Sequence, residues 1–355
     1  MSASLGPGAE QVADRLGIRP GTFAHLWLAE LEAVGPPPPE LAPEPLTEAV
    51  AAERLALLGV PEADAADVLA TLPHPGDESW WCLEREVHRL VAAMGDPDAR
   101  RGVWPSFEGE RHPVALRCHF IHVALATMPF TLAWRAARGE PEATAIESLA
   151  DVARHMAIHR RVHGCTGIEA AWWVTLALRA ELTDLGRLQF NRLTLQVSDQ
   201  APPWYPPEVA AEMGPGFRPG DPCLGIHIPE GAPLDHAAVE ASLERAAEYF
   251  GRHYPVGQRR VATCVSWLLD DQLADYLPET SNIVMFQRRF ELLPGFFDGD
   301  ASILEFVFRV AADHPLDRLA QRTTLERAVV AHLRAGRHWR VRTGWLDLPV
   351  ASAPR

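Results

Sequence analysis

The chain contains no lysine, and all 33 of its basic side chains are arginines, against 47 acidic ones. Without a lysine amine, pyridoxal phosphate cannot be attached as a Schiff base in the usual way, which excludes that class of enzyme. The formal net charge of −14 repels the phosphates of nucleic acids. We therefore expect no nucleic-acid partner.

Cysteine and long apolar runs are also scarce. The five cysteines lie far apart and no CxxC pair occurs, so we expect neither a disulfide framework nor a zinc knuckle, and we expect a reducing cytoplasm. We find no continuous apolar run of roughly 18 residues, the length that a membrane span needs. Residues 1–10 lack the basic and apolar regions of a secretory signal. These absences predict a cytoplasmic protein with no membrane partner.

Several nucleotide and hydrolase motifs are missing as well. The sequence has no GxGxxG, no P-loop and no GxSxG. Their absence argues against Rossmann dehydrogenases, nucleotide hydrolases of the P-loop type and α/β-hydrolases.

The length of 355 residues and the hydrophobic fraction of 47% leave room for two domains. Residues 1–48 are rich in proline and glycine and predict two short helices followed by an extended connector. Residues 49–184 have a helical pattern throughout and predict an all-α domain. The helices are expected at residues 11–16, 22–31, 84–94, 114–137, 145–163 and 170–182.

The pattern changes at residue 185. Alternating apolar residues predict strands at residues 188–197, 224–229, 261–268, 304–310 and 339–348. The first of these strands should contain a bulge near Asn191, where the alternation changes parity. Helices are expected after Asp235, with a buried stripe from Val239 to Phe250, and at residues 325–335. Mixed elements over residues 185–355, after an all-α domain, predict the α+β class for the chain.

The segment 261–290 places polar side chains within apolar sequence, where they cost free energy unless they find partners. Cys264 and Ser266 share one face of the expected strand, while Trp267 lies on the other. The pair would line a substrate pocket, with Cys264 as acid, nucleophile or wall; alternatively, Cys264 is a small core residue. Asn282 and Gln287 offer amides for substrate binding.

His227 lies near the end of the strand 224–229, facing away from Ile226 and Ile228. An imidazole titrates near neutral pH and can act there as a general base, or can simply bond to a loop. Within the strand 304–310, Glu305 and Arg309 predict either a paired buried charge or a base that contacts substrate.

Two further patterns concern ion binding. His155, His159 and His163 share one helix face, but the arginines around them oppose a dication, so we expect a solvated or interdomain face and no metal. Arg322, Thr323 and Thr324 precede the helix at 325–335, whose N-terminus could bind a pyrophosphate; alternatively, Thr323 forms a capping box that satisfies the helix's own amides.

Four segments together resemble one known family. They are Leu185-Gly186-Arg187-Leu188-Gln189-Phe190, Ile226-His227-Ile228-Pro229, Cys264-Val265-Ser266-Trp267-Leu268-Leu269, and Ser281-Asn282-Ile283 with Phe286 and Arg289-Phe290. From about residue 50 to 348, the chain resembles bacterial acyltransferase-domain proteins. Those proteins have a helical N-acyltransferase-type N-terminal domain and a GNAT-like C-terminal domain.

The resemblance implies transfer of an acyl group from a thioester to an amine on a small molecule or peptide. The thioester would be an acyl-CoA, or the acyl-pantetheine of a carrier protein, and its pantetheine arm would lie between two splayed strands. His227 would accept the amine proton, and Cys264 and Ser266 would line the cleft. Arg322 to Thr324 would stand where the family binds pyrophosphate.

The sequence departs from the family in two respects: no glycine-rich loop precedes the helix at 325–335, and the helix from Val239 to Phe250 follows two strands rather than one. Two other hypotheses therefore stay open. One is a GNAT-shaped binding module that holds a thioester or metabolite without turnover. The other is a thioester hydrolase that acts through Cys264.

Overall fold

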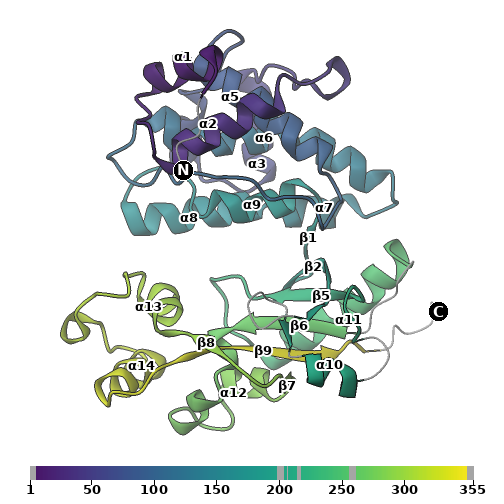
Figure 1. Ribbon diagram of the computed structural model, residues 1–355, viewed down its shortest axis with the longest axis vertical. Helices are drawn as coiled ribbons and strands as arrows, with labels where there is room; N and C mark the ends of the chain where they lie inside the picture. Colours follow the sequence, from purple (N-terminus) through teal and green to yellow (C-terminus); the bar gives the residue numbers. More distant parts are fainter. Residues whose placement is uncertain (1–4, 198–203, 206, 214–216, 256–260, 350–355) are drawn as a thin grey trace. The chain divides into compact units, whose positions relative to one another are not determined.

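The computed structural model describes residues 5–197, 204–205, 207–213, 217–255 and 261–349. The chain divides into two compact units, Met1–Thr183 and Asp184–Arg355 (Figure 1). The sequence pattern predicts the start of the second domain one residue later, at residue 185.

The first unit is built from helices up to its last residues, where β1 (Leu182–Asp184) begins. The helices are α1 (Pro7–Leu16), α2 (Phe23–Val34), η1 (Pro39–Leu41), α3 (Glu48–Leu57), α4 (Glu62–Leu69), α5 (Glu78–Ala92), α6 (Val114–Ala136), α7 (Glu142–Leu149), α8 (Asp151–His163) and α9 (Ala171–Leu178).

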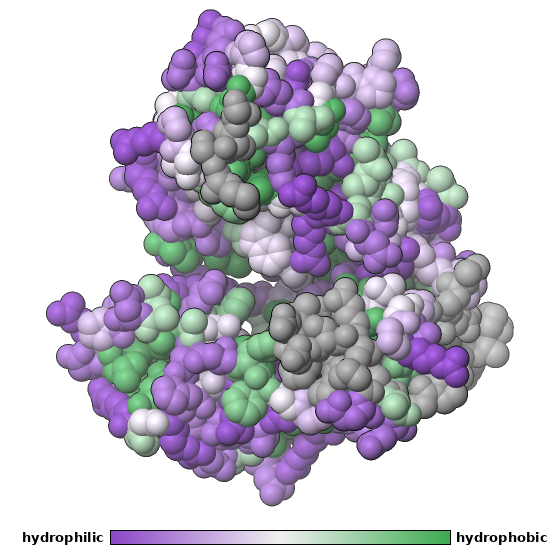
Figure 2. Space-filling model, viewed as in Figure 1, coloured by the Kyte–Doolittle hydropathy of each residue, from purple (hydrophilic) through white to green (hydrophobic). Residues whose placement is uncertain are grey.

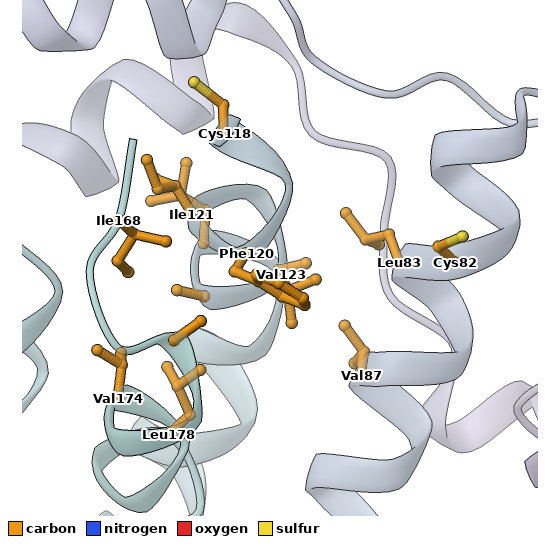
Figure 3. Packing of buried hydrophobic residues seen from close by; sticks show 14 of the residues in the cluster. Cys82, Leu83, Val87, Cys118, Phe120, Ile121, Val123, Ile168, Val174 and Leu178 are labelled. Atoms are coloured by element: carbon orange, nitrogen blue, oxygen red, sulfur yellow. The ribbon is translucent and has the colours of Figure 1, made fainter. Parts of the chain in front are cut away.

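The core of this unit forms around α6. In Figure 3, Leu83 and Val87 of α5 lie on one side of Phe120 and Val123 of α6, and residues from Ile168 to Leu178 lie on the other. The proline-rich N-terminal segment belongs to the same core, since α2 buries Trp27 and Leu28 completely. Its helices, expected from the sequence, are therefore part of the first unit rather than a separate segment.

Helix α6 is long and apolar enough to cross a membrane by length and composition alone. However, 72% of its most apolar window is buried inside the protein, as in the central helix of a helical core. On the face drawn in Figure 2, polar residues cover most of the molecule, and apolar residues form small separate groups.

The second unit mixes strands and helices. Its strands are β2 (Gln189–Thr194), β3 (Gln196–Val197), β4 (Trp204–Tyr205), β5 (Pro222–His227), β6 (Val261–Ser266), β7 (Glu291–Leu292), β8 (Phe297–Asp298) and β9 (Arg340–Asp347). Its helices are α10 (Pro207–Met213), α11 (His236–His253), η2 (Trp267–Leu269), η3 (Asp271–Asp275), α12 (Asn282–Gln287), α13 (Asp300–Phe308), η4 (Leu316–Arg318) and α14 (Thr324–Arg334).

The main sheet has the order β1-β2-β5-β6-β9-β7, and β8 pairs with β9; β3 and β4 form a small separate pair. Strands β5 and β6 are parallel, while β2–β5, β6–β9 and β7–β9 are antiparallel. Because a parallel pair cannot be joined by a hairpin, α11 makes the connection from β5 to β6. Asp235 caps α11 by accepting hydrogen bonds from Ala237 N and Ala238 N, both at 3.1 Å, as the sequence predicts.

Both faces of the sheet are covered. One face packs Phe190, Leu224, Ile226 and Cys264 against α11, and the other carries a cluster that includes Cys223. The expected bulge near Asn191 is wrong, since β2 pairs with β5 in unbroken register from Gln189 with His227 to Thr194 with Pro222. The alternation changes parity because apolar side chains are buried on both faces, not because the backbone slips.

The strand expected at 304–310 is also wrong, because α13 occupies this segment. Ile303, Leu304, Val307 and Phe308 repeat with helical spacing and pack in the clusters that α13 forms with α14. A short apolar run does not distinguish a strand from a helix by periodicity alone. The strands at β5, β6 and β9 and the helix α14 are confirmed.

Candidate active site

Among the described residues, the parallel strands β5 and β6 pair at two positions. Leu224 pairs with Ala262 and Gly225 with Thr263, whereas β5 continues to His227 and β6 to Ser266. Beyond the last pair, the facing edges of the two strands are not joined by a ladder. Figure 1 shows the two strands side by side in the centre of the sheet. Backbone N–H and C=O groups at such an opening need other partners, and a ligand with amide groups can supply them.

His227 lies at the open end of β5 and is half-buried. Its Nε2 is 2.7 Å from Oδ1 of Asn191 on β2. Because a carbonyl oxygen only accepts hydrogen bonds, this contact places a proton on Nε2. The Asn191 amide thereby holds the imidazole in one orientation.

Gly225 makes this contact sterically possible. A Cβ at Gly225 would lie 2.3 Å from Asn191 Oδ1 and 3.3 Å from His227 Nε2. A larger residue would displace the amide that contacts the imidazole. The sequence reasoning missed both Asn191 and Gly225, although the register of two alternating strands would have placed Asn191 beside His227.

Cys264 lies on the opposite face of the sheet from His227. It is 2% exposed and packs in the apolar cluster between the sheet and α11. Burial raises the pKa of its thiol to about 12, so the thiol stays protonated near neutral pH. The position fits the core-residue alternative and speaks against Cys264 as a nucleophile beside His227.

Ser266 and Trp267 lie where β6 ends. The Ser266 hydroxyl accepts a hydrogen bond from Leu268 N at 3.0 Å and so caps the short helix η2. Trp267 starts η2 instead of continuing the strand, and it packs partly buried against the cluster under α13 and α14. Both residues shape the end of β6, and their predicted contacts with substrate stay predictions.

The two amides on α12 differ in what they contact. Gln287 donates from Nε2 to the carbonyls of Leu268 and Asp270, both at 2.8 Å, so it fixes the backbone of the chain after β6. Asn282 is exposed at the start of α12. The predicted contact of Asn282 with substrate stays a prediction.

Glu305 and Arg309 do not form the pair expected from the sequence. Glu305 is exposed on α13, while Arg309 pairs with Glu230 in the loop after β5. The pairing differs because the segment is a helix, which places Arg309 at its left-handed C-terminal end with φ 57°.

Arg322, Thr323 and Thr324 are exposed at the start of α14. The capping box is confirmed: Thr323 Oγ1 accepts from Glu326 N, and Glu326 Oε2 accepts from Thr323 N, both at 3.1 Å. Burial raises the pKa of Glu326, but hydrogen bonds from these backbone amides and the charge of Arg322 outweigh it, so the pKa is lowered overall. A carboxylate thus occupies the place where a phosphate would bind.

The helix that follows the open strand is α11, not α14. Residues 228–235 connect β5 to α11, so this loop lies at the carboxyl end of one strand of the opened parallel pair. Ligands in sheets with parallel strands bind outside such carboxyl ends. The phosphate site predicted at α14 depended on a strand at residues 304–310, and α13 occupies that segment instead.

The histidines of α8 differ in burial, since His155 and His163 are partly exposed. His159 is fully buried, with Nδ1 3.0 Å from Cys165 O, so of the two expected alternatives the solvated one is wrong at this residue. His163 pairs with Glu169 at 3.3 Å, and Glu108 joins them with all ligand atoms within 4.8 Å of one another.

Two family models match the chain. The N-acyltransferase N-terminal domain matches residues 49–180, and the GNAT-like C-terminal domain matches residues 182–346. No curated protein matches the chain.

Solved structures match over nearly the whole chain. An acyltransferase variant in complex with octanoyl-CoA is 40% identical and has a TM-score of 0.82, with 96% of this chain and 100% of that chain covered. An acyltransferase in complex with CoA and 10C-teicoplanin is also 40% identical, with a TM-score of 0.82 and 96% and 99% covered. An acyltransferase in complex with decanoyl-CoA and teicoplanin is 41% identical, with the same TM-score and coverage as the second.

Proposed function

The chain belongs to the acyltransferases that join an N-acyltransferase N-terminal domain to a GNAT-like C-terminal domain, and we propose that it transfers a medium-length acyl group from acyl-CoA to an amine on a small molecule. The observation that carries this proposal is the opening between β5 and β6 beside His227. Acyl transfer from a thioester is the activity of the family.

The opening suits the pantetheine arm of CoA. That arm is a narrow chain with two amides, which can bond to the strand edges that end their ladder after Gly225 and Thr263. The similar structures were solved with octanoyl-CoA and decanoyl-CoA, so we propose acyl chains of this length for the present enzyme. An acyl carrier protein presents the same pantetheine and is the alternative donor.

His227 is the proposed general base. The acceptor amine attacks the thioester carbonyl, its proton passes to Nδ1 of His227, and Asn191 holds the ring through Nε2. Backbone N–H groups at the opening would stabilise the oxyanion of the tetrahedral intermediate, at about 3 kcal/mol for each well-placed donor. The C–S bond then breaks, and the CoA thiolate leaves with the electron pair.

Cys264 has no covalent role in this proposal, because its thiol is buried on the other sheet face with a raised pKa. The same position argues against a hydrolase that acts through Cys264. We also propose a two-domain enzyme of the cytoplasm, with an all-α first domain, and the five free cysteines suit a reducing compartment.

For the acceptor, we propose an amine carried by a glycopeptide or a similar polar small molecule. Two of the similar acyltransferases were solved with teicoplanin or 10C-teicoplanin. Glycopeptides with a free amine are therefore the first acceptors to test.

The test incubates the full chain with octanoyl-CoA or decanoyl-CoA and a panel of amines, including teicoplanin-type glycopeptides. Free CoA thiol is measured over time, and the acylated product is identified by mass spectrometry. We expect thiol release that depends on both acceptor and donor. Release without an acceptor would indicate a hydrolase, and binding of acyl-CoA without release would indicate a binding module.

A matched series with acyl carrier protein as donor decides between the two thioesters. We expect faster transfer from acyl-CoA. Acylation of the protein itself, detected at Cys264 in a peptide digest, would contradict direct transfer.

A further inference from the structure

We propose that Arg187 is a positioning residue for acyl-CoA, and that it sets the backbone of the loop 228–235 on which the diphosphate of CoA would rest. The inference rests on the proposed function. The guanidinium of Arg187 donates three hydrogen bonds to this loop: Nε to Pro233 O at 2.8 Å, Nη1 to Pro229 O at 3.1 Å and Nη2 to Ala232 O at 2.7 Å.

These contacts decide which way the peptide groups of the loop point. In a planar trans peptide, the N–H points opposite to the C=O of the same group. With the carbonyls of Pro229 and Pro233 turned toward Arg187, the N–H groups of Glu230 and Leu234 point away from it. A set of N–H groups on one side of a loop is the arrangement that binds phosphate oxygens.

The loop contains one turn of its own, at Glu230 and Gly231, where Gly231 adopts φ 111°. Pro229 and Pro233 lack N–H groups, so they take part in hydrogen bonds only through their carbonyls. Within the described residues, the only guanidinium that bonds to the loop's backbone carbonyls is that of Arg187. Arg309 contacts the same loop through the Glu230 side chain instead.

Arg187 is itself fixed by a tight turn between β1 and β2. Leu185 N bonds to Leu188 O at 3.1 Å, and Leu188 N bonds to Ser242 Oγ of α11 at 3.2 Å. Gly186 has φ 106°, and a Cβ there would lie 3.2 Å from Ser242 Oγ. The turn is therefore anchored on α11, the helix that follows the loop. The segment Leu185-Gly186-Arg187-Leu188 thus holds the Arg187 guanidinium against the loop carbonyls.

A second arginine provides a matched comparison. Arg327 donates from Nη1 to the carbonyls of Gln321 and Arg322, at 3.3 and 3.0 Å, in the segment before α14. The local chemistry is similar, and a carboxylate caps each of the two helices, Asp235 at α11 and Glu326 at α14. The difference is that α14 does not follow the opened strand. If the diphosphate binds to the loop after β5, substitution of Arg187, and not of Arg327, should raise the KM for acyl-CoA.

The experiment compares Arg187→Ala with Arg327→Ala, using octanoyl-CoA and S-octanoyl-pantetheine, which lacks the diphosphate. For Arg187→Ala we expect the KM for octanoyl-CoA to rise about tenfold, with kcat within about twofold. The loop N–H groups are then no longer held in place to donate hydrogen bonds to the charged diphosphate. The KM for S-octanoyl-pantetheine should not change. Arg327→Ala should leave both KM values unchanged.

Two outcomes would overturn the proposal. Equal losses with both donors would show that Arg187 supports the fold rather than the diphosphate. A rise in the KM for octanoyl-CoA with Arg327→Ala alone would place the phosphates at α14.

Two controls keep the result decisive. Ethylguanidine at millimolar concentration should lower the raised KM of Arg187→Ala, and Arg187→Lys should stay impaired because one ammonium cannot reach three carbonyls in the guanidinium geometry. Full recovery by Arg187→Lys would contradict the three-carbonyl role. Calorimetric binding of CoA and of pantetheine to the same variants needs no acceptor, so a failure of the proposed transfer reaction is distinguished from a failure of this inference.

Discussion

The two faces of strands β5 and β6 differ sharply although they alternate along the same backbone. One face carries His227, half-buried and bonded to Asn191 at 2.7 Å, at the end where the ladder has stopped. The other carries Cys264, 2% exposed, among apolar side chains of α11. Residues that look equally reactive in the sequence therefore have opposite environments, one polar and accessible, the other apolar and closed.

The comparison teaches that the type of a residue predicts its chemical role less well than the face of the sheet on which its side chain lies. A thiol in an apolar cluster has its pKa raised to about 12 and behaves as a small hydrophobic group. An imidazole at an open strand end with an amide partner is held in one orientation by that partner. The start of α14 resembles the closed face, since Glu326 already satisfies its amides.

The largest effect is expected for the open face. His227→Ala should lower kcat for acyl transfer by about 100-fold, because general-base catalysis contributes on that order. Steady-state kinetics with octanoyl-CoA measures the loss, and a thermal melt within a few degrees of the wild type is the control. Unchanged turnover would remove His227 from the mechanism.

The second largest effect is expected at Asn191, which tests whether its contact with His227 orients the imidazole. Asn191→Ala removes the acceptor for His227 Nε2, and we expect about a tenfold loss in kcat because the ring is no longer held in one orientation. Asn191→Asp retains an oxygen acceptor and should keep more activity than Asn191→Ala. Equal activity of the two variants would show that the contact does not orient the base.

For the closed face we expect an effect on stability rather than on rate. Cys264→Ala should cost about 1 kcal/mol of unfolding free energy through the lost buried sulfur, with kcat changed less than about threefold. Urea denaturation and initial rates measure the two quantities. A complete loss of activity with an intact fold would return Cys264 to the mechanism.

The stability difference between the wild type and Cys264→Ala should depend on pH. Because burial raises the pKa of the Cys264 thiol above its unfolded value, its contribution to stability is present below about pH 8.5 and is lost as pH rises toward about 12. The stability difference between the wild type and Cys264→Ala should therefore shrink between pH 8 and pH 10.

The smallest effect is expected at α14. Thr323→Ala removes the N-cap and should cost about 1 kcal/mol of stability without changing the KM for acyl-CoA. Denaturation and kinetics on the same preparation test this expectation. A clear rise in that KM would favour the phosphate site first predicted at Arg322 to Thr324.

Much of the fold could be predicted from local pattern. The helix after Asp235, with its stripe from Val239 to Phe250, is confirmed, as are the capping box at Thr323 and the strands β5, β6 and β9. These elements have strong periodicity and clear end signals. The strand prediction for residues 304–310 was wrong because an apolar helix of nine residues and a short buried strand have similar compositions.

The site was predicted only in part. His227 was identified by its residue type and its place at a strand end, but its partner Asn191 comes from a strand 30 or more residues earlier in the chain. Arg187 was noticed as part of a motif, while its contacts with the loop 229–233 span more than 40 residues. Such pairs depend on strand order and register, which no local pattern contains.

The sequence by itself determined the helical and mixed halves, the absence of lysine chemistry and the choice of His227 as a candidate base, because composition, periodicity and caps act over a few residues. Only the tertiary structure decided that His227 and Cys264 face opposite ways, that the ladder between β5 and β6 stops after two pairs, and that α11 rather than α14 follows the opening. The reason is physical: facing, burial and pKa depend on which distant segments pack together, and that packing is a property of the whole folded unit.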